Sequence, residues 1–324
     1  MIKRWLLAIA ALAMIPTVHA QTSAQPYPTR PVRIIVPWTA GGASDTSARI
    51  VAEKLSERMG QQFVVENRGG AGGTIGAAAL AKSNPDGYSL LLGSSTELVI
   101  SPHIYKSVGY DTNRDFASIS HVASQPLMLV VHPSVPAKSV QDLLALAKSR
   151  PGELNCASAG NGSTLHLAQV LFENAAQVKL QHIPFNGSGQ AAAATLSGDT
   201  QISFNTVPTV IELVRSGKLR GLAVTGTKRM GAMPDLPTVG ESGVPGYEML
   251  IWTALLAPRG TPAEIVGRLN AEVASVLATP DVREAFAKLG IDVSSSTPEE
   301  LASYVAAEWT KTGKIVAASG AKIE

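Results

Sequence analysis

The sequence predicts an α/β protein built from two domains, each with a mainly parallel sheet flanked by helices. Two observations favour this class. An apolar strand, a bend rich in glycine or serine, and a helix start follow one another at 34–45 and again at 156–163. Strands and helices also alternate along most of the chain, an order that is typical of a parallel sheet covered by helices.

The first half is expected to hold three strands separated by two helices. The helix that follows the first bend has apolar residues on one face, and Gly60 stands where a helix C-cap belongs. The turn 84–87 (Asn-Pro-Asp-Gly) leads into the third strand. The expected elements are strands 32–36, 63–66 and 88–92 and helices 44–59 and 74–82.

The second half repeats the pattern and ends in a helical tail. Ser139 has the character of a helix N-cap, and Pro262 followed by Glu264 is typical of the first turn of a helix. A proline-rich loop is expected over 233–247. The expected strands are 127–131, 154–158, 179–184, 201–205, 219–225 and 250–257. The expected helices are 139–149, 163–176, 188–197, 208–216, 262–278, 281–288 and 298–317.

Two joins between domains are expected, near 124–126 and near 248–250. They divide the chain into domain 1, formed by 21–124 plus 250–324, and domain 2, formed by 125–249. Ligand sites in open α/β sheets lie beyond the carboxyl ends of the strands. The strand ends of the two sheets are therefore expected to face each other across a cleft.

Residues 1–20 have the pattern of a signal peptide. Lys3 and Arg4 precede a short apolar run, and small residues lead up to Ala20. The run is too short for a membrane span, which needs about 20 residues. We therefore expect cleavage after Ala20 and a mature chain outside the cytoplasm, in the periplasm.

Charge and cysteine content exclude several functions. The chain has 27 basic and 25 acidic residues, and loss of Lys3 and Arg4 leaves 25 of each. This balance argues against binding to nucleic acid or to an anionic membrane surface. The single Cys156 cannot form an internal disulfide, and a chain of this length can bury a large core without one.

The bends are the candidate binding elements. A helix start leaves backbone N–H groups without partners, and these groups hold an anion without any charged side chain. The expected contributors are the bend 37–42, where Asp45 should cap the following helix, the hydroxyl-rich strand end 94–96, and the helix starts at 160–164 and 186–188. This pattern predicts a protein that binds a small carboxylate.

Three other chemistries fit poorly. The bend 67–76 fails the dinucleotide pattern, because Ile75 stands where the third glycine is needed, and no P-loop follows. A hydrolase could be assembled from Ser163, His166 and Asp45, but no Gly-x-Ser-x-Gly elbow exists and the spacing favours local capping. The scattered histidines and single cysteine predict no metal site. Neither catalysis nor a cofactor is expected.

A series of short motifs extends in order along essentially the whole mature sequence. They are Tyr27-Pro28-x-x-Pro31, Val36-Pro37-Trp38-x-x-Gly41-Gly42-x-x-Asp45, Val65-Glu66-Asn67-Arg68-x-Gly70-Ala71-Gly72-Gly73, Pro85-Asp86-Gly87-Tyr88, Tyr110-Asp111-x-x-x-Asp115-Phe116, Ser158-Ala159-Gly160-Asn161-Gly162-Ser163-x-x-His166-Leu167, Gly187-Ser188, Gly198-Asp199, Pro234-Asp235-x-Pro237-Thr238-Val239 and Ala257-Pro258-x-Gly260-Thr261-Pro262. In these motifs the chain resembles the Bug-type periplasmic solute-binding proteins of tripartite tricarboxylate transporters.

The resemblance implies a two-domain clamshell of the type II periplasmic-binding-protein class, with two crossovers between domains. It implies a dicarboxylate, tricarboxylate or aromatic carboxylate ligand, with one carboxylate held by the first bend and ordered waters. The site residues implied by the bends and the resemblance are Trp38, Thr39, Ala40, Gly41, Gly42, Asp45, Gly72, Gly73, Thr74, Ser94, Ser95, Thr96, Ala159, Gly160, Asn161, Ser163, Gly187, Ser188 and Asn205.

Three positions depart from the family pattern. Asn205 stands where an Asp that pairs with ligand amino groups is frequent, which weakens the case for an amino-acid ligand. Glu97 would repel a second carboxylate if it faced the cleft, so either it points away, which we favour, or the ligand has a donor or cationic end. Trp38 replaces a commoner Phe or Tyr and is expected to narrow the pocket or stack on a flat ligand.

We consider three alternative functions for the protein. The favoured one is a monomeric binding protein that passes its carboxylate to the membrane components of a tripartite tricarboxylate-type transporter. The second is a binding protein that signals to a membrane sensor kinase. The third is a secreted serine hydrolase that uses Ser163 and His166.

Overall fold

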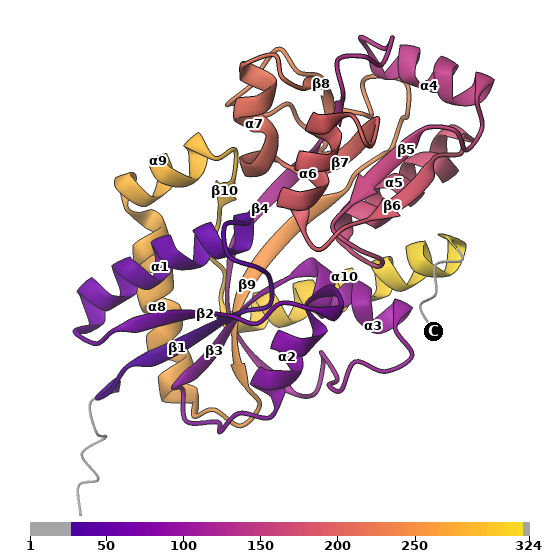
Figure 1. Ribbon diagram of the computed structural model, residues 1–324. Coiled ribbons are helices and arrows are strands. Elements are labelled where there is room, and N and C mark those ends of the chain that lie inside the picture. The colour runs from indigo at the N-terminus through magenta and orange to yellow at the C-terminus, as the bar shows by residue number, and fades with distance from the viewer. Residues whose placement is uncertain (1–26, 320–324) are drawn as a thin grey trace, which may run out of the picture.

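The computed structural model describes residues 27–319. The expected signal peptide, residues 1–20, lies outside this range. Within it, none of the helices combines the length and the apolar character that crossing a bilayer requires. Figure 1 shows two α/β halves joined by long strands, which confirms the predicted fold class.

The first half is built on three parallel strands. Strand β1 lies between β2 and β3, with Ile34 paired to Val65 on one side and to Leu90 on the other. Helix α1 packs on one face of this sheet through Leu55. The elements are β1 (Val32–Val36), α1 (Ala43–Met59), β2 (Phe63–Asn67), the 3-10 turn η1 (Ala71–Gly73), α2 (Thr74–Ala81) and β3 (Ser89–Ser94).

Two long strands connect the halves. Strand β4 (Phe116–Val131) pairs with β9 (Leu250–Pro258) along its first part and with β7 along its last five residues. The expected strand 127–131 is therefore only the end of a longer one. Polar residues such as Ser118, Ser120 and His121 interrupt its apolar pattern, which hid its first part in the sequence.

A short helical segment also escaped the sequence analysis. Residues after β3 continue into the helical turns η2 (Thr96–Ile100) and α3 (Ser101–Ile104). This segment is deeply buried, and Leu98, Val99 and Ile100 are core residues rather than a surface connection. Apolar packing of this segment therefore fixes the position of the end of β3.

The second half holds the parallel strands β5, β6 and β7, with helices on their faces. Strand β8 pairs antiparallel with β4. The elements are α4 (Val140–Ser149), β5 (Asn155–Ser158), α5 (Thr164–Ala176), β6 (Gln181–Pro184), α6 (Ser188–Ser197), β7 (Ile202–Thr206), α7 (Val207–Arg215) and β8 (Arg220–Val224). The expected strands and helices of this half are confirmed to within a few residues at each end.

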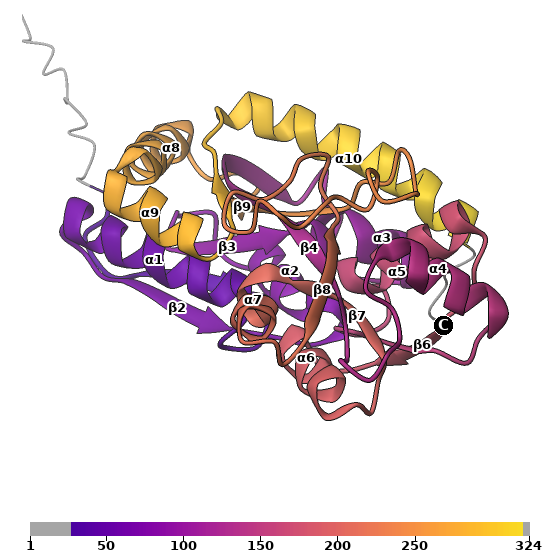
Figure 2. The same ribbon diagram turned by 90° about the horizontal axis from the view of Figure 1, so that it is seen from above.

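The tail returns to the first half and then runs along both. Helix α8 packs beside α1, and α10 contacts η2 and β4 on one side and α5 on the other. Figure 2 shows α10 extending over both halves. The tail elements are α8 (Ala263–Ala278), α9 (Pro280–Lys288), β10 (Asp292–Val293) and α10 (Pro298–Ser319).

Strand directions bring the two sets of bends together. The sheet order is β2-β1-β3-β9-β4-β7-β5-β6. Strands β1 to β3 run in the direction of β4, whereas β5 to β7 run against it, because β9 and β7 are each antiparallel to β4. The carboxyl ends of the two parallel sets therefore point toward each other, as the cleft prediction requires. The two expected joins fall within β4 and at the start of β9, and the division into two domains stays a prediction.

Candidate functional site

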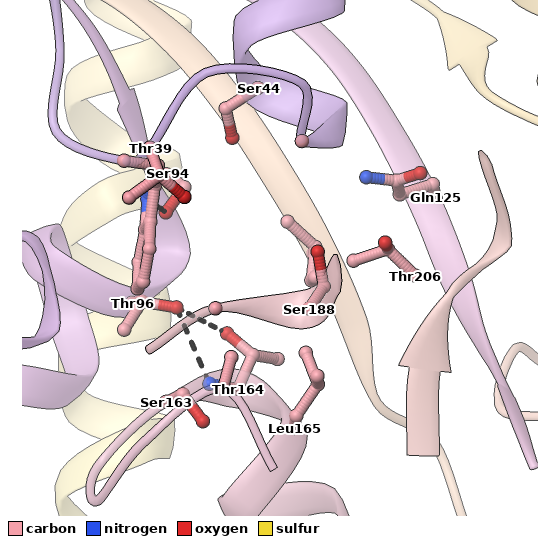
Figure 3. Close-up of a pocket in the computed structure, with 15 residues that line it drawn as sticks. Thr39, Ser44, Ser94, Thr96, Gln125, Ser163, Thr164, Leu165, Ser188 and Thr206 are labelled. Atoms are coloured by element: carbon pink, nitrogen blue, oxygen red, sulfur yellow. Dashed lines mark hydrogen bonds between the residues drawn. The ribbon is translucent and has the colours of Figure 1, made fainter. Parts of the chain in front are cut away.

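A cavity lies where the bends of the two halves meet (Figure 3). Its cavity volume is about 50 Å³, well below the range of about 300–1,000 Å³ that is usual for small-molecule sites. Residues of both halves line it: Trp38, Thr39, Gly42, Ser44, Ser94, Thr96, Gln125, Ala159, Ser163, Thr164, Leu165, Gly187, Ser188, Thr206 and Ile251.

Four helices begin at this cavity. Their N-cap residues all line it: Gly42 for α1, Ser163 for α5, Gly187 for α6 and Thr206 for α7. The first N–H groups of a helix have no partner within the helix, and the helix dipole adds positive potential at that end. Among the described lining residues, none carries a charge. The cavity can therefore hold an anion by neutral donors alone.

Backbone conformation explains the glycine at the start of α6. Gly187 has φ of 116°, in the region that side chains rarely adopt. A Cβ atom there would also lie 3.3 Å from the Thr39 hydroxyl oxygen in the opposite half. The backbone at Gly187 thus approaches the side chain of Thr39 in the opposite bend, and the cavity is narrow at that point.

Asp45 supports the first bend instead of lining the cavity. Its carboxylate accepts hydrogen bonds from the Gly41 N–H at 2.9 Å, the Arg49 Nε at 3.0 Å and the Asn67 amide at 2.9 Å. Burial raises its pKa, but these hydrogen bonds outweigh burial and hold the pKa below its usual value. The N-cap of α1 is Gly42, and no side chain caps the helix, so the prediction that Asp45 caps α1 was wrong; the Asp45 side chain instead accepts a hydrogen bond from the bend that precedes the helix.

Hydroxyl groups connect the two halves at the floor of the cavity. The Thr96 and Thr164 hydroxyl oxygens are 2.6 Å apart, and the Thr164 N–H donates to the Thr96 oxygen at 3.3 Å. Figure 3 shows both contacts as dashed lines between the end of β3 and the start of α5. The halves therefore meet through side chains of the site itself.

Glu97 lies behind the cavity wall and is not a lining residue. Its carboxylate accepts hydrogen bonds from the N–H and the hydroxyl of Ser94, and it packs against Gly73. The favoured prediction, that Glu97 points away from the cleft, is confirmed. Burial raises its pKa to about 7, and the hydrogen bonds from Ser94 oppose this rise only in part.

The residues of the hydrolase hypothesis are not assembled for catalysis. The Ser163 hydroxyl donates to the Gly160 carbonyl at 2.8 Å and caps α5 by accepting from the His166 N–H. The His166 Nδ1 accepts from the Gly162 N–H, and its ring stacks on His182 at 3.9 Å between centroids. Burial lowers the pKa of His166 to about 4. His166 is thus a packed, neutral residue, as its position in the sequence favoured.

Most of the expected site residues lie at the cavity or at a second hollow beside it. Trp38, Thr39, Ala159 and Gly187 line both spaces. The expected residues that line the main cavity are Trp38, Thr39, Gly42, Ser94, Thr96, Ala159, Ser163, Gly187 and Ser188. Those that line the second hollow without lining the first are Gly72, Gly160 and Asn161.

The remaining expected residues have supporting positions. Asn205 is fully buried, and its amide joins the Ser188 carbonyl to the Thr206 N–H, which ties the starts of α6 and α7 together. Gly73 makes room for Glu97, as described above. The residues outside both linings are Ala40, Gly41, Asp45, Gly73, Thr74, Ser95 and Asn205.

Sequence reasoning missed five lining residues, Ser44, Gln125, Leu165, Thr206 and Ile251, and named Thr164 only as part of the helix start at 160–164. Gln125 is the most informative of them. It is 4 % exposed, and its Oε1 has no hydrogen-bond partner among the described residues. Figure 3 shows its side chain extending from β4 toward the space between Ser44 and Thr206. Its amide nitrogen, a hydrogen-bond donor, is the end directed at this space (Figure 3), which makes Gln125 a candidate contact for a ligand oxygen.

Fold and cavity together define a two-part binding protein for a small solute. The sequence model of the tripartite tricarboxylate transporter family receptor (TctC) matches residues 47–321, and the chain belongs to this family of periplasmic solute-binding proteins. In the described residues, no group of three or more His, Cys, Asp or Glu side chains is placed to hold a metal ion.

Relatives and solved structures agree with this assignment. The chain is 38% identical to a UPF0065 protein from the tcbD-tcbE intergenic region of Pseudomonas sp. (strain P51), covering 97% of this chain and 94% of the relative. It is 37% identical to protein BugT of Bordetella pertussis, covering 99% of each.

Three solved structures share the fold. R. palustris Rpa4515 with adipate has a TM-score of 0.89 and 36% identity, covering 92% of this chain and all of that one. Periplasmic binding protein BugD has a TM-score of 0.86 and 34% identity over the same share. MatC from Rhodopseudomonas palustris with bound malate has a TM-score of 0.84 and 31% identity, covering 90% and 100%.

Proposed function

We propose that this protein captures a small carboxylate (a dicarboxylate, tricarboxylate or aromatic carboxylate) in the cavity between its halves, for a tripartite tricarboxylate-type transporter. The observation that carries the proposal is the meeting of four helix N-caps at one uncharged cavity. The adipate and malate carried by two structural relatives support a carboxylate ligand.

In this proposal, uncharged hydrogen-bond donors hold the carboxylate ligand. The oxygens of the ligand accept hydrogen bonds from N–H groups in the first turns of the helices, with hydroxyls such as Ser188 and Thr206 beside them. Leu165, Ile251 and Trp38 contact the apolar part of the ligand. Because the cavity excludes bulk water, each of these hydrogen bonds is stronger than it is in solution.

Closure couples the two halves. In the open form the ligand binds one half first, and bending within β4 and at the start of β9 brings the other half onto it. The Thr96–Thr164 contact and the approach of Thr39 to Gly187 form in the closed arrangement. Binding energy thereby drives a change of shape that a membrane partner can recognise.

The cellular setting follows from the same proposal. The signal peptide directs export and is cleaved after Ala20, and the mature chain works in the periplasm as a monomer. Its partners are the membrane components of the transporter, which receive the closed, loaded form. This role needs no cofactor and no chemical change of the ligand.

Calorimetry on the mature chain tests the proposal. Titration with linear, branched and aromatic acids is expected to give saturable binding, with the ligand recovered unchanged and with compaction in solution scattering. The variant Ser188→Asp places a carboxylate at the start of α6 and is expected to abolish binding through like-charge repulsion. Ser139→Asp, at the remote start of α4, is the matched control and should bind normally. Absence of binding across all the acids would refute the proposal.

A further inference from the structure

A buried carboxylate stands directly behind one wall of the cavity. Glu97 is 0 % exposed, whereas Ser94, on the cavity side of it, is a lining residue. Among the described residues, no Lys, Arg or His forms an ion pair with Glu97 or contributes to its pKa. A buried carboxylate without an ion-pair partner is costly, which makes Glu97 a candidate for a role beyond packing.

The directions of the hydrogen bonds show how Glu97 orients the Ser94 hydroxyl in the cavity wall. The Ser94 hydroxyl donates to Glu97 Oε2 at 2.6 Å, and the Ser94 N–H donates to Oε1. The Trp38 Nε1–H donates to the Ser94 oxygen at 3.3 Å. A hydroxyl has a single proton, and that of Ser94 is directed at Glu97. The Trp38 N–H occupies one of the two lone pairs of the Ser94 oxygen, so Ser94 can offer the cavity only its remaining lone pair.

We propose that the cavity prefers a monocarboxylate with an uncharged hydrogen-bond donor, a hydroxyl or an amide, directed at Ser94, and that Glu97 is the positioning residue that sets this preference. The inference rests on the proposed function: the ligand is still a small carboxylate, but one with a single carboxylate in place of two or three. A donor on the ligand completes the Ser94 hydrogen bonds. A second carboxylate at this point meets a lone pair and, behind it, the charge of Glu97.

Protonation of Glu97 reverses the direction of the hydrogen bond between Glu97 and Ser94. Its pKa lies at about 7 because of burial, so the carboxyl gains a proton as the pH falls below that value. The new O–H can donate to the Ser94 oxygen, which frees the Ser94 proton to turn toward the cavity. Ser94 then offers a donor, and a second carboxylate becomes acceptable.

Other titrating groups do not interfere in this range. Among the described residues, Tyr110 is the titratable neighbour of Glu97; its hydroxyl donates to the Glu97 carbonyl, and burial raises its pKa far above neutrality. No charged group of β3, η1, α2, α3 or α10 enters the balance that sets the Glu97 pKa. Burial also keeps His166 on α5 and His182 on β6 neutral, each with a pKa lowered to about 4.

Matched acids test the proposal on the mature protein. Succinate and its monoamide succinamate form one pair, and terephthalate and its monoamide form a second, flat pair suited to Trp38. Whichever of the two monoamides binds is expected, at pH 8, to bind about tenfold more tightly than the diacid of the same pair. At pH 6 this ratio is expected to shrink, because the diacid gains affinity while the monoamide does not. A diacid that binds more tightly at pH 8 overturns the proposal.

Variants separate positioning from folding. Glu97→Gln places an amide N–H against the Ser94 oxygen, as protonation does, and is expected to favour the diacid at both pH values. Ser94→Ala is expected to remove the preference in either direction. Glu173→Gln, a half-buried glutamate on α5 away from the cavity, is the matched control and should keep the wild-type ratio and its pH dependence.

Each result decides between the two proposals. If Glu97→Gln keeps the wild-type ratio, the role of Glu97 is refuted while carboxylate capture stands. If Glu97→Gln does not fold, the wild-type pH series decides alone, and a ratio that is constant from pH 6 to pH 8 refutes it. If neither pair nor any other acid binds, the proposed function fails and this inference with it.

Discussion

The hydroxyl oxygens of Thr96 and Thr164 lie 2.6 Å apart and join the end of β3 to the start of α5 across the cavity. Both side chains are buried, at 3 % and 1 % exposed, although they belong to opposite halves of the molecule. The pair thus combines two roles: each residue lines the ligand cavity, and together they hold its two walls in contact.

Removing one hydroxyl of this pair should weaken ligand binding. Thr96→Val keeps the shape of the side chain but loses the hydrogen bonds to Thr164, which are made in the closed form. A lost neutral hydrogen bond costs about 1 kcal/mol, so we expect the dissociation constant of a bound acid to rise about fivefold in calorimetry. Thr195→Val, a buried threonine on α6 away from the cavity, should leave affinity unchanged. Equal affinity of Thr96→Val and wild type would disprove a closing role.

The amide of Gln125 should matter for binding and not for stability. Gln125→Leu removes a buried oxygen that has no partner, so the free energy of unfolding should stay level or rise by about 1 kcal/mol. Affinity for a bound acid is expected to fall about tenfold, because the amide donor in the cavity is lost. Gln169→Leu is the control: its Oε1 is likewise buried without a partner, but it lies outside the cavity. A Gln125 variant that binds like wild type would show that the amide does not touch the ligand.

Gly73 should tolerate no side chain. A Cβ atom there would lie 2.9 Å from Glu97 Oε2, and its φ of 85° is already unfavourable for alanine. We expect Gly73→Ala to lower the free energy of unfolding by about 2–3 kcal/mol in urea denaturation. Gly60→Ala has a similar φ of 69° but open space around it, so its loss should be about 1 kcal/mol. Similar losses in the two variants would mean that Glu97 moves aside freely.

The stacked histidines should make stability depend on pH. Burial lowers the pKa of His166 and of His182 to about 4 in the folded protein, below the usual value of about 6.5 in the unfolded chain. Between these values the unfolded chain binds more protons, so their contribution is full above pH 6.5 and declines as the pH falls toward 4. The loss of unfolding free energy over this range should be smaller in His182→Gln by about 1 kcal/mol, a figure reduced for solvent screening. An identical decline in both proteins would contradict the assignment.

Local sequence was sufficient to locate the bends. The glycines and hydroxyl residues that follow apolar runs identified the ends of β1, β3, β5 and β6, and nine of the expected residues line the cavity. Such bends depend on the conformational freedom of glycine and on local capping, which a few neighbouring residues decide. The same reasoning could not tell a lining residue from a supporting one, because the carboxylate of Asp45 and the amide of Asn205 turn to backbone groups only after the bends are formed.

By itself, the sequence determined most of the order of strands and helices, the positions of the helix starts that line the cavity, and the family. These properties arise from apolar periodicity and short motifs along one stretch of chain. Tertiary structure alone decided that Gln125 and Ile251 reach the cavity and that Glu97 acts from behind Ser94. The reason is physical: β4 and β9 bring distant residues to one point, and the hydrogen bonds and the pKa of a buried group depend on all the atoms packed around it.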